Sequence, residues 1–392
     1  PTLSAIRGLT YNSANIIDYQ DAIAAETTIS DITALQALLD NVDASVSAFV
    51  AVQMAATSSN ALNIDEPTLS AIRSLIHNSA NVTDYQDAIA SESTITDLSA
   101  LQGLIDSVDA SITAFAKVQA AATNSNALNI DAPTLSAIRG LTHNSTNMID
   151  YQDAIAAESA ITDLTALQGL IDSVDASVTA FAVVQNAVAI SNASNVLTAT
   201  LQDIRSLTFN QAALNDYQQA IEGEASITNV TALQNLIDSV DASIIAFIAV
   251  QTAATSSNAL NIDAPTLSAI RGLTHNNANI SDYQGAIASE STIADVTALQ
   301  ALIGSVDASI NAVAEVQAAA VSNDANSIDS AVLLSIRGLS YNANNLLAYR
   351  NAIADETAIA DVAMLQELID SVDGSIVSFA TVQTAATTSN AS

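Results

Sequence analysis

The sequence predicts an all-α protein, built as a tandem array of six three-helix repeats of 66 residues that form an elongated rod or superhelix. Three observations predict it. Apolar residues recur three and four positions apart, which is helical spacing. Arginine, tyrosine, glutamine and aspartate each recur every 66 residues without an insertion. Half of the residues are apolar, so a packed core is expected and disorder is not.

The 66-residue period divides the chain into six copies. The arginines that mark it are Arg7, Arg73, Arg139, Arg205, Arg271 and Arg337. The predicted helical repeats are residues 1–66, 67–132, 133–198, 199–264, 265–330 and 331–392. The fourth and sixth copies diverge most, and in both alanine replaces the leading proline. The sixth copy is incomplete by four residues.

The first two predicted helices of each copy are short. In the first copy, apolar residues three apart over residues 3–9 predict a short helix. Where the second and third copies begin, Asp65 and Asp131 stand just before Pro67 and Pro133, which is typical of an N-cap followed by proline in the first turn. Asparagines then indicate a turn, and a second helix is predicted over about residues 14–26.

The strongest signal predicts a third, long helix of about 27 residues that begins near Ile32. Apolar residues from Ile32 to Ala56 alternate three and four apart, which makes a heptad-like seam. Asp31 favours the positive end of the helix dipole. Further apolar side chains widen this seam into a broad apolar stripe. One long helix can therefore pack in the bundle of its own copy and also against a second partner. A β structure is the alternative, because Thr, Val and Ile are plentiful. It is disfavoured because the apolar residues do not recur at every second position, as they would in a strand.

Two recurring polar positions are candidate structural residues at the junctions between copies. The arginine is the regular cation of each copy, and we expect it to pair with equivalents of Asp18, Glu26 or Asp43. Capture of an anionic ligand is the alternative, which the surrounding negative charge opposes. A glutamine stands where the seam expects an apolar residue, and a polar side chain there fixes register. These glutamines are Gln53, Gln119, Gln185, Gln251, Gln317 and Gln383.

No residues form a catalytic, cofactor-binding or metal-binding pattern. The histidines share one position of the repeat with tyrosine and phenylalanine, so we expect a ring packed at a turn and not a metal ligand. They are His77, His143 and His275. The acids at Glu26, Asp31, Asp40 and Asp43 lack the spacing of a calcium loop, so only nonspecific cation binding is expected. We expect no enzyme activity and no cofactor.

The charge balance restricts the partners. Eight Lys+Arg face 41 Asp+Glu, for a net charge of −33, which disfavours nucleic acid and anionic lipid. No stretch approaches about 20 consecutive apolar residues, so membrane insertion is not expected. Cysteine is absent, so stability must come from packing and not from disulfides. Because the chain begins with Pro1 and shows no signal peptide, we expect an excerpt of a longer or processed protein.

The in-register period, the acidic and lysine-poor composition and the abundance of Ala, Ser, Thr and Asn resemble the tandem-repeat regions of large bacterial secreted or cell-surface proteins, such as adhesin stalks and extracellular fibre proteins. The resemblance covers the whole chain and implies an extracellular or cell-surface location. Many such stalks are β-sandwich arrays with calcium at their joints. This chain differs in its predicted helices and in lacking calcium loops.

We therefore expect a non-enzymatic structural protein, a stalk or filament subunit whose partners are neighbouring repeats and identical chains. The alternative is a multivalent binding or adhesion protein whose three-helix modules bind a host or cell-surface protein. Such a protein needs an exposed aromatic or arginine-rich hot spot on each copy. Aromatic residues are only 4% of the chain and tryptophan is absent, which favours the structural role.

Overall fold

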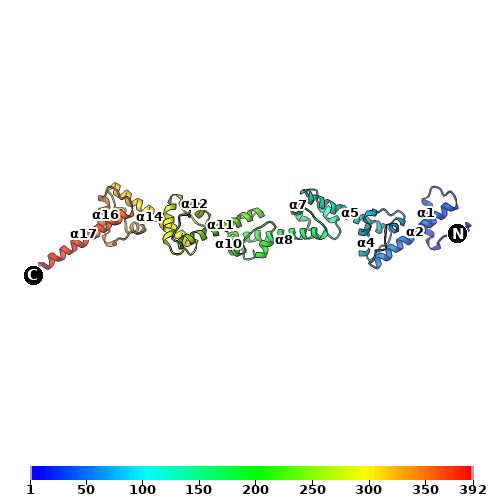
Figure 1. The fold of residues 1–392 in the computed structure, drawn as a ribbon, viewed down its shortest axis with the longest axis horizontal. Coiled ribbons are helices and arrows are strands. Elements are labelled where there is room, and N and C mark those ends of the chain that lie inside the picture. Colours follow the sequence, from blue (N-terminus) through cyan, green and yellow to red (C-terminus); the bar gives the residue numbers. More distant parts are fainter. Residues whose placement is uncertain (1, 390–392) are drawn as a thin grey trace. The chain divides into compact units, whose positions relative to one another are not determined.

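The computed structural model describes residues 2–389, and this part of the chain is all-α (Figure 1). It contains seventeen α-helices and seven 3₁₀ helices and no strand. The predicted fold class is therefore confirmed at the level of all-α, and the β alternative is wrong. The chain divides into two compact units, residues 1–182 with 202–205 and residues 183–201 with 206–392.

Six long helices lie where the seam predicts them, and their first residues are 66 positions apart. They are α2 Ile32–Thr57, α5 Leu98–Thr123, α8 Leu164–Ala189, α11 Val230–Thr255, α14 Val296–Ser322 and α17 Val362–Ser389. Asp31 is the N-cap of α2, because its carboxylate accepts the N–H of Ala34 at 2.8 Å. At 26 residues, α2 has nearly the predicted length.

A shorter helix precedes each long one. These helices are α1 Ile16–Ala25, α4 Val82–Ser91, α7 Met148–Ala157, α10 Leu214–Glu222, α13 Ile280–Ser289 and α16 Leu346–Asp355. Each follows a 3₁₀ turn, namely η2 Ser13–Asn15, η3 Ser79–Asn81, η4 Ser145–Asn147, η5 Gln211–Ala213, η6 Asn277–Asn279 and η7 Ala343–Asn345. The α-helix therefore starts two residues later than predicted, because Asn12 caps a 3₁₀ turn first.

The shortest helices open the later copies. They are α3 Glu66–Ala71, α6 Ala132–Ala137, α9 Thr198–Asp203, α12 Ala264–Ala269 and α15 Ser330–Ser335, and the first copy has the 3₁₀ turn η1 Leu3–Ala5. The predicted cap of α6 is confirmed, since Asp131 accepts hydrogen bonds from the backbone and hydroxyl of Thr134 at 2.9 and 2.5 Å. The Thr134 hydroxyl, and then its N–H, hold the pKa of Asp131 below its usual value.

Four hydrophobic cores are each built from two consecutive copies, and a fifth, smaller core around Tyr19 and Leu39 lies within the first copy. In the first unit, one core gathers the second half of α2, α3, α4 and the first half of α5. The next core gathers the second half of α5, α6, α7 and the start of α8. In the second unit α14 is shared between two cores in the same way. A long helix thus serves two cores, as its wide apolar stripe predicts.

Four of the long helices, α2, α8, α11 and α14, are long and apolar enough to cross a membrane, judged by length and composition only. The expectation that no stretch approaches a spanning helix is therefore corrected. Uninterrupted apolar runs are short, but Ala, Val and Ile among uncharged Ser, Thr and Gln keep the average hydropathy high. Between 28% and 33% of the most apolar part of each helix is buried inside the protein.

Removing an N-cap is expected to weaken the unit that contains it. Asp97 caps α5 by accepting the N–H of Ala100 at 2.8 Å, and Asp97→Ala should destabilise the first unit by about 0.5–2 kcal/mol. Asp97→Asn is the matched control, because Asn229 caps α11 with the same 2.8 Å bond. Urea unfolding followed by circular dichroism measures both, and equal stability of Asp97→Ala and the wild type would contradict the expectation.

Candidate functional site

The candidate site is the junction, which we define as the place where the second half of one long helix meets the short, medium and long helices of the next copy. In the first unit its core contains Val52 of α2, Leu69 of α3, Ile89 of α4 and Leu101 of α5. All four side chains are 0% exposed. Close packing of this kind resists sliding and bending, because any displacement opens a void.

The predicted glutamines join consecutive copies. Gln53 Nε2 in α2 donates to the carbonyl of Ile95, just before α5, at 2.9 Å. The same contact recurs from Gln119 to Ile161, Gln185 to Ile227 and Gln251 to Ile293, at 3.0 to 3.3 Å. Gln317 donates at 3.0 Å to the carbonyl of Ala360, one residue beyond the equivalent Ile359. The side chain is not a fully buried seam residue, since Gln53 is half-buried. Its role in fixing register stays a prediction, and Gln383 lies on an exposed stretch of α17.

Five of the six predicted arginines lie at the same junctions and contact serines, whereas Arg7 is exposed in the first copy. The backbone N–H of Arg139, after α6, donates to Ser111 Oγ of α5 at 2.9 Å, and its guanidinium donates to Ser107 Oγ at 2.9 Å. The turn that follows needs a left-handed residue, and Gly140 supplies it with φ +78°. Arg205, Arg271 and Arg337 make both contacts with equivalent serines, whereas Arg73 makes the backbone contact, to Ser45.

The expected arginine–carboxylate pairs are mostly replaced by these serine contacts. Within residues 2–389, one arginine lies within 4 Å of a carboxylate: Arg271 Nη2 is 3.9 Å from Glu224 Oε1. Glu224 is the equivalent of Glu26, so this pair is one of those predicted. Both side chains are about 40% exposed, so the pair contributes little to stability.

A network of a buried tyrosine, an aspartate and an asparagine recurs in five copies, and in the fourth Ala213 replaces the asparagine. The sequence predicted none of these contacts. The hydroxyl of Tyr151 in α7 donates to Asp175 Oδ1 of α8 at 2.5 Å, and Asn147 Nδ2 donates to the same oxygen at 2.7 Å. The Tyr151 hydroxyl also accepts the N–H of Asn144 at 2.9 Å. Tyr19, Tyr85, Tyr217, Tyr283 and Tyr349 contact equivalent aspartates.

Burial, and next the hydrogen bond to the carboxylate, raise the pKa of these six tyrosines. Both effects disfavour the tyrosinate, which would lose hydration and face a negative charge. The pKa of Tyr151 and that of Tyr217 rise to about 12, and those of the other four rise above 10. The network therefore holds neutral phenols and is structural in its chemistry.

Raising the pH above 10 is expected to lower the Tm of the chain. A phenol whose folded pKa exceeds its unfolded value of about 10 contributes full stability below pH 10. That contribution is lost as the pH rises toward the folded pKa near 12. Circular dichroism melts between pH 8 and about 12 measure the effect. A single lysine leaves few competing titrations.

The control for this pH dependence is the double variant Tyr151→Phe, Tyr217→Phe. It removes the two phenols with the largest rise in pKa, so its Tm should fall less steeply with pH than that of the wild type. A constant wild-type Tm between pH 10 and 12, or an identical slope in the double variant, would contradict the assignment.

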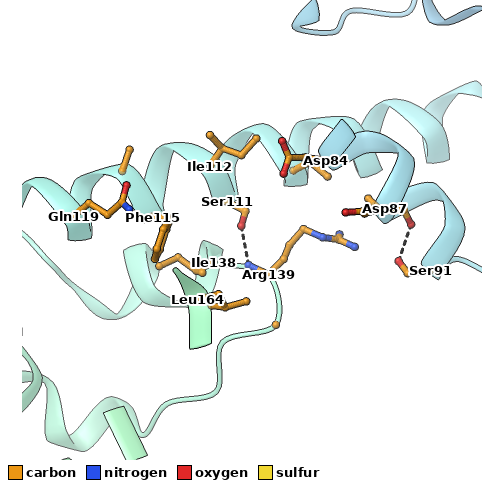
Figure 2. Close-up of a pocket in the computed structure, with 14 residues that line it drawn as sticks. Asp84, Asp87, Ser91, Ser111, Ile112, Phe115, Gln119, Ile138, Arg139 and Leu164 are labelled. Carbon is orange, nitrogen blue, oxygen red and sulfur yellow. Dashed lines mark hydrogen bonds between the residues drawn. The ribbon is translucent and has the colours of Figure 1, made fainter. Parts of the chain in front are cut away.

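A groove of about 680 Å³ opens at the junction between the second and third copies (Figure 2). Phe115 and Gln119 of α5 line one end, and Arg139 reaches toward Asp84 and Asp87 of α4 at the other. Two predicted residues, Gln119 and Arg139, therefore line the same groove. Its lining includes no histidine, cysteine or lysine, so Ser91 and Ser111 have no imidazole, thiolate or amine base within it.

The same groove recurs twice in the second unit. One instance, of about 360 Å³, includes Asp216 and Arg271, and the other, of about 420 Å³, includes Asp282 and Arg337. An arginine, at least one serine and at least one aspartate, together with aliphatic side chains, line all three grooves. Such a lining suits docking of a polar and apolar surface better than bond-making chemistry.

The histidines and the clustered acids have structural surroundings. His77 and His143 pack edge-to-face on Tyr85 and Tyr151, with ring centroids 6.4 Å apart, and Phe209 packs in the same way on Tyr217. Asp40 accepts a hydrogen bond from Gln36. Asp43 accepts hydrogen bonds from a tyrosine and an asparagine. No group of three or more potential His, Cys, Asp or Glu ligands comes together within residues 2–389.

Three comparisons with known proteins give no relative. No protein-family model, no curated protein and no solved structure matches the chain.

Proposed function

We propose that the chain is a non-enzymatic extracellular structural protein, a stalk or filament subunit made of six three-helix repeats that stack into a rod or superhelix. The observation that carries the proposal is that α2, α5 and α14 each contribute to two hydrophobic cores. The first half of α5 contributes Leu101 and Ile105 to one core, and its second half contributes Val118 and Ala122 to the next. Two consecutive cores are thus joined by continuous helix and not by a flexible linker.

Sharing a helix favours a mechanical role because bending between two cores requires breaking helical hydrogen bonds or buried contacts. The glutamine contact adds a directional bond at each junction and recurs with nearly the same length. Near-identical junctions give near-identical rotations, and the repetition of one rotation produces a rod or a superhelix. The net charge of −33 keeps such an assembly soluble and limits lateral bundling.

Negative-stain electron microscopy of the purified 392-residue chain tests the mechanical part of the proposal. We expect uniform, unbranched particles on the order of 200 Å long, because each copy advances by about one 26-residue helix of roughly 40 Å less its overlap with the next. Particles that resemble flexible strings of beads with a broad range of end-to-end distances would reject it. Immunogold labelling of the source cells tests the extracellular location, and label confined to the cytoplasm would reject that part.

The recurring groove favours one alternative, a multivalent binding protein that holds a host or cell-surface protein at several junctions. Each groove presents an arginine beside aliphatic side chains, which in the first groove include Ile112, Ile138 and Leu164. Adhesion that Arg139→Ala, Arg271→Ala and Arg337→Ala together abolish, without a change in particle length, would favour this function over the structural one.

A further inference from the structure

The second half of α17 exposes an apolar face that the equivalent half of every other long helix buries. Figure 1 shows this half, at the red end of the colour bar, extending past α16. Val382 is 64% exposed and Phe379 is 63% exposed. The valines equivalent to Val382 are at most 1% exposed, and they are Val52, Val118, Val184, Val250 and Val316.

The first copy has the matching exposed surface. Ile29 is 36% exposed, whereas its equivalents are 3–5% exposed, and they are Ile95, Ile161, Ile227, Ile293 and Ile359. Leu3 and Leu35 are half-buried, although their equivalents in the five later copies are at most 1% exposed. In each later copy, the second half of the preceding long helix covers this surface, as α2 covers that of the second copy.

The polar groups of the two surfaces also correspond. Gln383 of α17 stands at the position of the glutamines that donate to the next copy, and Ile29 supplies the equivalent carbonyl. Ser375 and Ser371 stand at the positions of the two serines that contact arginine at the third copy, and Arg7 is the equivalent arginine. The glutamine, the two serines and the arginine of an internal junction are therefore all present, divided between α17 and the first copy.

We propose that residues 374–387 of α17 dock on the first copy of a second molecule of this chain and form a head-to-tail junction like the internal ones. The proposal rests on the proposed structural function and names its partner and contact residues. The occupant follows from continuity with the interfaces already in the chain, since the same two surfaces meet at each internal junction. If further copies preceded residue 1 or followed residue 392, the same contact would form within one molecule.

Analytical ultracentrifugation of the 392-residue chain from 1 to about 100 µM, concentrations that bracket affinities typical of modest interfaces, tests the docking. We expect reversible head-to-tail oligomers, and association that strengthens with salt, because two chains of net charge −33 repel each other. Val382→Glu and, on the opposite surface, Ile29→Glu should each weaken association at least tenfold, since a carboxylate would enter the apolar contact. Both positions are exposed in the monomer, so circular dichroism should report an unchanged fold.

The matched control is Thr381→Glu, one residue away on α17. Its equivalents Lys117 and Glu315 are charged and exposed, so a glutamate at this position should leave association unchanged. A monomer at every concentration, equal effects of Thr381→Glu and Val382→Glu, or binding of α17 to phosphatidylcholine vesicles in place of a second chain would overturn the docking. A monomer that is nevertheless uniform and unbranched in electron micrographs would reject this inference alone and leave the proposed structural function standing.

Discussion

A proline at position 110, near the middle of α5, is expected to uncouple the two cores that share this helix and to destabilise the first unit by about 3 kcal/mol or more. Proline removes one helical hydrogen bond and its ring clashes with the carbonyl four residues earlier, that of Asp106. Ala110 is exposed, so the substitution removes no packed side chain. The effect therefore isolates the continuity of the helix from the packing of either core.

Hydrogen exchange read by mass spectrometry measures this uncoupling directly. In the wild type we expect slow exchange throughout α5, because both halves are held by a core. In Ala110→Pro, exchange should accelerate around residues 107–114, and electron micrographs should show particles bent at one place.

Two substitutions serve as controls for the proline. Ser99→Pro places the same ring in the first turn of α5, where no helical hydrogen bond is lost, and should leave stability within about 1 kcal/mol of the wild type. Ala110→Gly should cost about 1 kcal/mol without a local bend. If Ala110→Pro proved no more harmful than Ser99→Pro, α5 would not couple the cores and the mechanical proposal would lose its main support.

The long helices were predictable because their signals are local. The seam from Ile32 to Ala56 and the cap at Asp31 lie within one stretch of chain, so periodicity and capping chemistry define the helix without tertiary information. The shorter helix was less well placed. Its first turn is 3₁₀ and is capped by Asn12, whose Oδ1 accepts the N–H of Ala14. Apolar spacing does not distinguish a 3₁₀ turn from an α-helical one.

The partners at the junctions were not predictable in the same way, because they join residues far apart in the chain. The periods of the tyrosines and aspartates are visible separately in the sequence, but no local pattern joins Tyr151 to Asp175, which is 24 residues later. Charge alone suggested carboxylates for Arg139, yet the serines of α5 lie closer once the copies pack. One signal in the sequence could have predicted these contacts: the two polar partners recur in the copies with a constant number of residues between them.

A cavity in a junction core should be among the most destabilising single changes. Leu101 is 0% exposed and packs in the core shared by α2, α3, α4 and α5, so Leu101→Ala is expected to destabilise the first unit by about 2–5 kcal/mol. The loss combines removal of buried apolar atoms with the void they leave. Denaturant unfolding followed by circular dichroism gives the value. Leu128→Ala is the matched control, because Leu128 is 79% exposed and its truncation should change stability by less than about 0.5 kcal/mol.

The same substitution in the second unit tests whether the junctions are energetically equivalent. Leu299 of α14 is also 0% exposed and occupies the corresponding place in its core. Equivalent surroundings should give Leu299→Ala the same cost as Leu101→Ala to within about 1 kcal/mol. The two substitutions should also be additive when combined, since they have no shared neighbours. Strongly unequal costs would mean that repetition of sequence does not produce repetition of junction strength, which a uniform mechanical array requires.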